Sequence, residues 1–163
     1  MSSIQVTPVP TTLGPTGFRE ANFNGPIEES YFARLKQVGP FRQDNPPASQ
    51  ANTLQQLCAI DATAPTSFVA GAAGTIIGIL AQSNAAITAG AATFRPSLNG
   101  VVQGSATLDS VILSSAAQKA VVTLATPISF VAGDLISIML STNAGYLPIT
   151  ADHNSYLLIR WAA

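Results

Sequence analysis

The charged residues of this chain are crowded into its first third, and this uneven distribution limits how the chain can fold. The whole chain has seven basic and eight acidic residues, and eight of these fifteen lie in residues 1–50. The same segment holds seven of the eleven prolines. Each proline removes a backbone donor and interrupts regular structure. Residues 51–163 hold only seven charged residues. In a typical free domain, about a quarter of all residues are charged. We therefore predict an extended arm, residues 1–50, joined to an oligomerisation domain, residues 51–163, that covers its surface by assembly.

Several classes of protein are excluded by composition. The net charge is −1 and no basic stripe is present, so we expect no nucleic-acid partner. The longest apolar stretch, Gly71 to Ala81, is shorter than the roughly 20 residues of a membrane span. The first residues lack the positive charge and apolar run of a signal peptide, which predicts a product made inside a cell. The single cysteine, Cys58, is expected to be a small buried apolar residue.

One segment of the arm has helical spacing. It runs from Pro26, which suits a first helical position, to Gly39, which can end a helix. Apolar residues recur between them at Ile27, Tyr31, Leu35 and Val38. We predict one short helix here, and a hinge at residues 46–52.

After the hinge, short apolar runs rich in Val, Ile and Thr alternate with turn residues, which is typical of strands. Alternation in the last run places Leu157, Ile159 and Trp161 on one face. Thr75–Ala81 does not alternate, which predicts that both of its faces are covered. About eight strands indicate an all-β, jelly-roll-like β-sandwich. The predicted strands are Gln55–Ile60, Ser67–Val69, Thr75–Ala81, Ala91–Leu98, Ala106–Leu113, Ala120–Ala125, Leu135–Leu140 and Tyr156–Trp161.

The domain also contains a short repeat. Pro65-Thr-Ser-Phe-Val-Ala-Gly71 returns as Pro127-Ile-Ser-Phe-Val-Ala-Gly133, and an apolar strand follows each copy. This order predicts a short edge strand whose Phe enters the core, then a Gly turn, then a long central strand. Two copies are too few to separate a true repeat from a chance likeness between turn-and-strand sequences.

Two of these segments resemble a known family. The run Ile87-Thr-Ala-Gly-Ala-Ala-Thr-Phe-Arg-Pro-Ser-Leu-Asn-Gly100 and the later Phe130-Val-Ala-Gly-Asp-Leu-Ile-Ser-Ile138 resemble the β-sandwich modules of tailed-bacteriophage virion proteins. Those modules share a Leu-Asn-Gly turn and a Phe-x-Ala-Gly-Asp turn, and both suit positive φ angles. The resemblance covers roughly residues 67–140, not the arm. It implies a virion component, made in the host cytoplasm, that commonly forms homotrimers.

The arm favours one role within that family. A proline-rich arm suits a capsid decoration, or cement, protein on the capsid exterior, which binds the major capsid protein and stabilises the head. No coiled-coil heptads or shaft repeat point to a fibre. The alternative is a receptor-binding head or tail fibre protein that recognises a host surface glycan. We expect aromatic anchors and arginines of the arm to bind the partner, namely Phe18, Arg19, Phe23, Tyr31, Phe32, Arg34, Phe41 and Arg42.

Catalytic chemistry has little support in the sequence. Asp152-His153-Asn154-Ser155 contains the only histidine, but neighbours in one loop do not make a catalytic triad, so we expect a polar turn here. A hydrolase on a lectin-like scaffold remains a weaker third hypothesis. We expect no metal or cofactor. The domain's four aspartates, Asp61, Asp109, Asp134 and Asp152, are expected to be solvated or to cap turns, with Asp134 capping its Gly turn.

The aromatic residues of the domain offer one further possibility. Trp161, Tyr146 and Tyr156 have flat faces that suit a carbohydrate ring. In an alternating last strand, however, a Trp more often lies in the core or in a subunit interface. We therefore expect Trp161 to be a core or interface residue.

Overall fold

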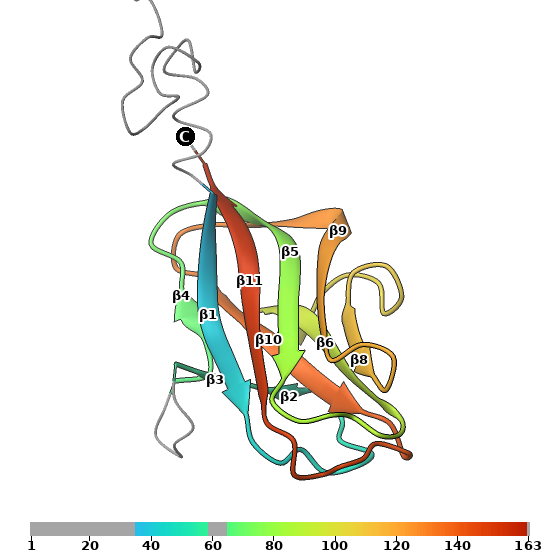
Figure 1. Cartoon of the computed structure of the whole chain (residues 1–163). Helices are drawn as coiled ribbons and strands as arrows, with labels where there is room; N and C mark the ends of the chain where they lie inside the picture. Colours follow the sequence, from blue (N-terminus) through green and yellow to red (C-terminus); the bar gives the residue numbers. More distant parts are fainter. Residues whose placement is uncertain (1–34, 59–64, 163) are drawn as a thin grey trace, which may run out of the picture. The chain divides into compact units, whose positions relative to one another are not determined.

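The computed structural model describes residues 35–58 and 65–162, and these residues form eleven strands (Figure 1). The bounds are β1 (Leu35–Gln43), β2 (Thr53–Leu54), β3 (Gln56–Leu57), β4 (Phe68–Val69), β5 (Gly74–Ser83), β6 (Ala91–Leu98), β7 (Val101–Val102), β8 (Val111–Ser114), β9 (Lys119–Phe130), β10 (Leu135–Thr142) and β11 (His153–Trp161).

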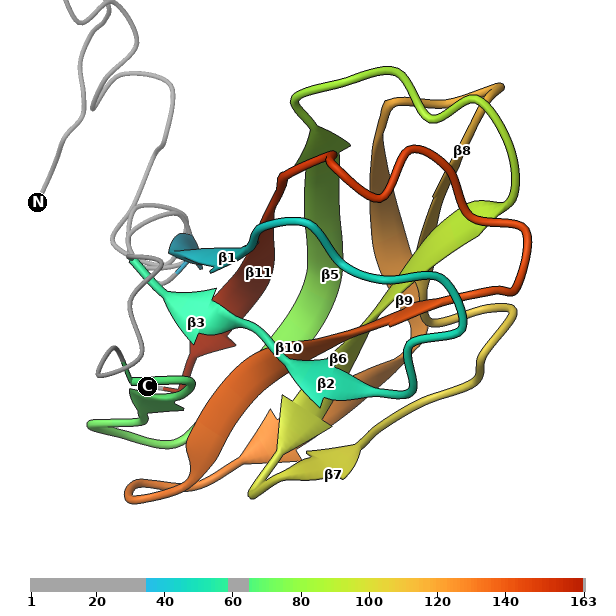
Figure 2. The same ribbon diagram turned by 90° about the horizontal axis from the view of Figure 1, so that it is seen from below.

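The strands form two sheets. Sheet A has the order β3-β1-β11-β5-β9, and sheet B has the order β2-β10-β6-β7, with β4 also paired to β10 and β8 to β6. The pairs β11–β5, β5–β9 and β10–β6 are antiparallel. In Figure 1, β10 and β6 cross behind the strands of sheet A, and Figure 2 shows the same two layers from below. The predicted all-β class is confirmed.

The core lies between the sheets and follows from the alternation of side chains along each strand. Leu157 and Ile159 of β11 are fully buried, as the sequence pattern predicts, and they pack with Phe94 of β6 and with Ile136 and Ile138 of β10. A fully buried Leu or Ile contributes about 1.5–3 kcal/mol relative to an exposed one. These side chains therefore hold the two sheets together.

The first strand of sheet A comes from residues that the sequence pattern assigns to the arm. β1 (Leu35–Gln43) precedes residue 50, and the chain from Lys36 onward forms one compact unit. Residues 35–39 of the predicted helix are therefore strand, and the rest of that helix lies outside the described residues. Gly39 has a φ of +140°, a backbone conformation that an L side chain rarely adopts. This φ lies outside the helical range, so a helix cannot continue through Gly39.

A bulge explains why β5 does not alternate. Leu158 and Ile159 of β11 are neighbours, yet they face Gly78 and Ile76, so Ile77 is an extra residue in β5. The bulge puts Gly78 and Ile79 side by side among the buried positions, while Ile77 remains half-buried. The prediction that both faces of this strand are covered is therefore only partly met within one chain.

The two copies of the repeated segment carry the chain from one sheet to the other. Phe68 pairs with Ile136, three residues after Gly133, and Phe130 pairs with Gly74, three residues after Gly71. Each copy thus pairs, at an equivalent register, with the start of the strand that follows the other copy. Both Phe rings also pack on Trp161, at centroid distances of 6.3 Å and 5.6 Å.

Some strand predictions need correction. Residues 106–110 form turns, and β8 begins only at Val111, because Asp109 and Ser110 hydrogen-bond back to Ser105 and Ala106. Of the predicted strand Gln55–Ile60, only Gln56–Leu57 is strand, as β3, and residues 59–60 lie outside the described residues. The short strand β2 lies just before the predicted range. The predicted strand Ala120–Ala125 is the first half of β9, which continues to Phe130.

Candidate interaction surface

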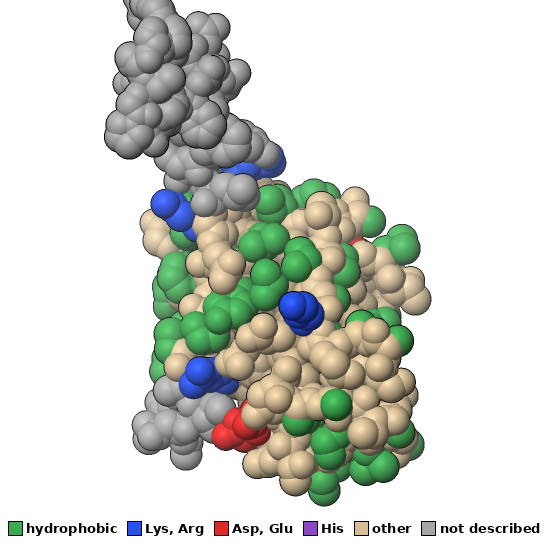
Figure 3. Space-filling model, viewed as in Figure 1, with side chains coloured by type: hydrophobic (Ala, Val, Ile, Leu, Met, Phe, Trp, Pro, Cys, Tyr) green, Lys and Arg blue, Asp and Glu red, His purple; other side chains and the backbone are tan. Residues whose placement is uncertain are grey.

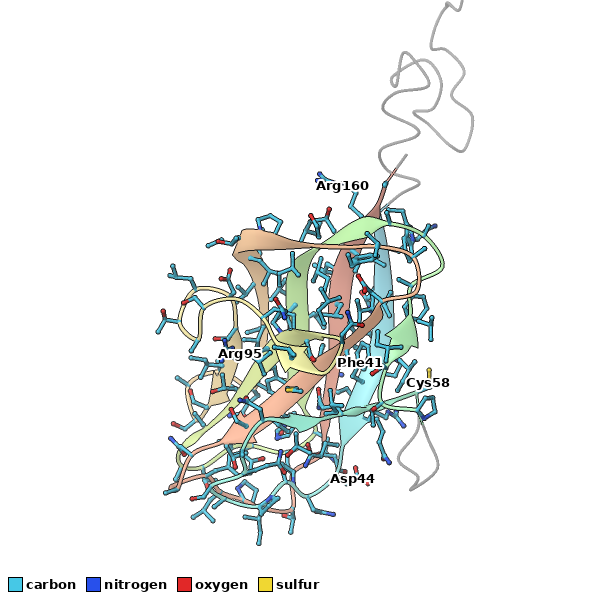
Figure 4. All side chains as sticks on the ribbon, turned by 180° about the vertical axis from the view of Figure 1, so that it is seen from behind. Phe41, Asp44, Cys58, Arg95 and Arg160 are labelled. Atoms are coloured by element: carbon cyan, nitrogen blue, oxygen red, sulfur yellow. The ribbon has the colours of Figure 1, made fainter. Side chains whose placement is uncertain are left out.

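The residues that we expect to bind a partner divide into two groups. Six of them lie outside the described residues: Phe18, Arg19, Phe23, Tyr31, Phe32 and Arg34. Phe41 is fully buried in the core (Figure 4), so its position does not match the prediction of an exposed anchor. Arg42 points to the other side of β1, where its Nε donates to Asn154 Oδ1 at 2.8 Å.

The outer face of sheet A carries an apolar patch, formed by Ile77, Leu80, Val121, Tyr156 and Leu158. Leu80 of β5 lies between Val121 of β9 and Tyr156 of β11. Val121 is 60 % exposed, and the other four side chains are half-buried. Figure 3 shows apolar side chains gathered over this face, with few charged ones among them. We call these five residues the sheet A patch.

One side of the sheet A patch is bordered by a polar row. At the end of β5 where Gln82 lies, Lys119 is its neighbour on β9 and Asn154 is its neighbour on β11. Arg42 continues the row through its hydrogen bond to Asn154. An apolar centre with a polar rim is the usual anatomy of a protein interface.

Two carboxylates extend this rim. Asp44 follows β1 and Asp152 precedes β11. Desolvation, and then a hydrogen bond and the negative charge of Asp152, raise the pKa of Asp44, while Arg42 lowers it. Asn84 holds Asp152 in place, because its Nδ2 donates to Asp152 Oδ2 and its Oδ1 accepts the Asp152 N–H, both at 2.8 Å. We call Asp44 and Asp152 the acidic pair.

The segment Asp152-His153-Asn154-Ser155 does not form a catalytic arrangement among the described residues. His153 Nε2 is hydrogen-bonded to the Tyr146 hydroxyl at 2.7 Å, and Ser155 Oγ is bonded to Gln55 Oε1. Alternation along β11 directs His153 and Ser155 into the core and Asn154 outward, while Asp152, which precedes the strand, is half-buried. The predicted polar turn is replaced, from His153 onward, by the start of β11.

The His153 ring lies in an apolar environment. The edge of Phe94 meets it at a centroid distance of 5.4 Å, and the side chain is 1 % exposed. Burial lowers the pKa of His153 to about 4, although Asp152 opposes this shift, and burial raises the pKa of Tyr146 to about 12. Both groups are therefore neutral at pH 7, which suits a structural hydrogen bond and not proton transfer.

The described aspartates of sheet B's loops cap turns, as predicted. Asp134 Oδ2 accepts the Val131 N–H at 2.8 Å, which closes the turn at Gly133. Asp109 accepts the N–H groups of Ser105 and Thr126, at 2.8 Å and 3.1 Å. These hydrogen bonds lower the pKa of both carboxyls. Asp61 lies outside the described residues.

The single cysteine does not lie where the sequence predicts it. Cys58 is exposed and has a φ of 68° (Figure 4), so the prediction of a buried residue is wrong. It follows β3 in a turn, where its N–H bonds to the Pro40 carbonyl at 2.7 Å.

The three aromatic residues of the domain lie in different places. Trp161 packs against the core, as expected, while Tyr146 is fully buried and Tyr156 lies on the outer face of sheet A. The three aromatics therefore do not form one carbohydrate platform.

Within the described residues, no group of three or more His, Cys, Asp or Glu side chains is placed to hold a metal ion. The same part of the chain has no helix that is long and apolar enough to cross a membrane. No protein-family model matches the sequence, and no curated protein matches it either.

Proposed function

We propose that this chain is a structural protein of a bacteriophage virion, a decoration or cement protein that binds the major capsid protein from outside and stabilises the head. The observation that carries the proposal is the outer face of sheet A, an apolar patch on a domain with almost no charge. A surface of this kind is more stable when it is buried in an assembly than when it is exposed on a free monomer.

The family resemblance adds support from the two turns that define it. Asn99 and Gly100 have φ angles of 53° and 81°, as a tight hairpin turn requires, and Gly133 has a φ of 97°. Asn99 Nδ2 donates to Asp134 Oδ1 at 2.9 Å, so the two motifs meet in one hydrogen-bonded cluster. A jelly-roll topology for the domain is part of the same proposal.

The proposed mechanism needs no covalent chemistry. Residues 1–34, which precede β1, bind the capsid surface, and holding each bound residue in one conformation costs roughly 1–2 kcal/mol of backbone entropy. Apolar and aromatic burial must exceed that cost. Self-association, expected as a homotrimer from the resemblance, strengthens attachment because further arms bind at a high effective concentration once the first is bound.

Sedimentation with capsids tests the proposal. Purified chain is mixed with empty phage capsids that lack it, and the bound chain is counted per major capsid protein subunit. We expect binding in near-stoichiometric amounts. We also expect that capsids stripped of the chain come apart at a lower temperature and a lower internal pressure than capsids that carry it. Failure to bind any capsid overturns the cement role.

Copy number separates the two virion roles. Hundreds of copies per particle support a cement protein, whereas a handful supports the receptor-binding head or tail fibre protein. The fibre alternative also predicts that the isolated chain binds host cells or glycan arrays, and a cement protein does not. Loss of residues 1–34, which leaves β1 in place, is a poorer discriminator, since both roles predict that it abolishes attachment to the virion.

A further inference from the structure

We infer that the sheet A patch is the contact between two copies of this chain, packed face to face about a two-fold axis that runs parallel to the strands. The inference rests on the self-association proposed above and adds a two-fold contact to it, so the assembly is a pair of chains or a pair of trimers and not a single trimer. It does not depend on a capsid. It commits the patch to one occupant, a second copy.

The first support is the composition of the face. Ile77, Leu80, Tyr156 and Leu158 are half-buried within one chain and Val121 is 60 % exposed. They come from three adjacent strands, so their exposed parts form a continuous surface. Face-to-face packing covers the whole surface on both copies at once, because a two-fold contact uses the same patch twice.

The second support is the fixed position of the patch's one aromatic ring, that of Tyr156. A Cβ built on Gly39 would lie 2.8 Å from Tyr156 Cδ1 and 2.8 Å from the Ser155 carbonyl oxygen. The Tyr156 ring therefore lies against the bare backbone of β1. A large side chain that is already held in place loses little rotamer freedom on binding, which favours its use as an anchor.

The third support is the placement of charge, which selects the axis. Lys119 lies on the edge strand β9, and the acidic pair lies near β1 and β11 at the same end of sheet A. A two-fold axis parallel to the strands exchanges the two edges of the sheet but keeps this end. Each Lys119 then faces the acidic pair of the other copy.

The other charges near the acidic pair do not cancel its attraction for Lys119 of the other copy. Arg42 is the cation nearest to the acidic pair and partly balances it, and its Nε is already bonded to Asn154. One cation against two carboxylates leaves an acidic excess. Arg160 lies at the opposite end of the domain from Asp44 (Figure 4), away from this contact. Opposite charges at a rim mainly set orientation and association rate.

The test is the mass of the full-length chain by light scattering, for the wild type and for variants. We expect the wild type to contain an even number of chains and Leu158→Asp to have half that mass. Val101→Asp is the matched control: Val101 is 62 % exposed, but it lies on β7 of sheet B. This control should keep the wild-type mass, and circular dichroism should show that both variants retain their strands.

A charge exchange tests the axis without altering the core. Lys119→Asp should weaken self-association at least tenfold, and adding Asp44→Lys to it should restore most of the loss, because the exchanged charges again face each other. Lys119 and Asp44 are both exposed, so neither change threatens folding. Equal weakening in the single and the double variant overturns the proposed axis.

Two results overturn the contact itself. A wild-type trimer whose mass Leu158→Asp leaves unchanged assigns self-association to another surface, and it leaves the proposed cement role standing. A monomer in which removal of residues 1–34 increases solvent access to Tyr156 assigns the patch to the chain's own N-terminal residues. Capsid binding, measured separately, decides the cement role in either case.

Discussion

The side chain of Asn99 joins the turn after β6 to Asp134, in the turn before β10. Its Nδ2 donates to Asp134 Oδ1, and its Oδ1 accepts the Leu135 N–H, both at 2.9 Å. The Asn99 backbone has a φ of 53°, which Asn tolerates better than most residues. One residue therefore supplies both the turn conformation and the link between two loops.

Replacement of Asn99 separates these two contributions. Asn99→Gly keeps the backbone conformation but loses both side-chain hydrogen bonds, and the loss of the one from the Leu135 N–H costs about 1 kcal/mol. Asn99→Ala loses the same bonds and also strains the backbone, by roughly a further 1 kcal/mol. Urea unfolding should therefore rank wild type above Gly and Gly above Ala. Equal stability of the Gly variant and the wild type contradicts a stabilising role for the side chain.

The loop carboxylates predict a loss of stability in acid. The Ser105 N–H, and then that of Thr126, lower the pKa of Asp109 below its ordinary value of 3.8. The folded state therefore favours the ionised form, so this stabilisation is present above about pH 4 and is lost as pH falls through the folded-state pKa. Asp109→Asn should be less stable than the wild type at pH 7, and the difference should shrink toward pH 2. A difference that is constant with pH argues against the ionised carboxylate.

His153 predicts a second pH dependence, in a higher range. Burial lowers its pKa from 6.5 to about 4, so the unfolded chain binds a proton that the folded chain excludes. Stability should therefore fall as pH drops from 6.5 toward 4, by at most roughly 3 kcal/mol. His153→Gln, which does not titrate, should show a flatter profile over this range. Parallel profiles for the two proteins contradict a buried neutral imidazole.

Gly39 of β1 is predicted to tolerate a side chain poorly. Ala at this position meets the Ser155 carbonyl oxygen and Tyr156 Cδ1 at 2.8 Å, at a φ of +140°. We expect Gly39→Ala to destabilise the fold by about 2–4 kcal/mol, from strain and displaced packing. Gly100→Ala is the control, because its φ is +81° and nothing lies within 4 Å of the added Cβ. It should cost about 1 kcal/mol, as thermal unfolding can show.

The sequence is a good guide where the pattern is local. The long strands β5, β6, β10 and β11 follow from apolar or alternating runs that are bounded by turn residues. The two tight turns follow from Asn and Gly at positive φ. β1 is harder to predict, because Gly39 and Pro40 interrupt the alternation between Val38 and Phe41, both of which are buried. Residues that resemble a proline-broken arm thus belong to a sheet.

The candidate site depends on information that is not local. Ile77 and Leu80 belong to one apolar run in the sequence. Only the bulge opposite Leu158 and Ile159 of β11 shows which residues of that run face outward. Asp44 lies beside Asp152, and His153 is hydrogen-bonded to Tyr146, because of how the loops between them fold. Those loops carry no sequence motif that predicts either contact. Cys58 occupies a turn at positive φ, which its apolar neighbours in the sequence do not reveal.

The exchanged pairing of the two Phe-Val-Ala-Gly segments makes the two halves of the domain interdependent for folding. Phe68 completes its pairing only when β10 is present, and Phe130 only when β5 is present. Contacts so distant in sequence must form late, after much loop-closure entropy has been lost. A chain cut in the turn at residues 115–116 should therefore yield two fragments that remain unfolded separately and fold together only when mixed.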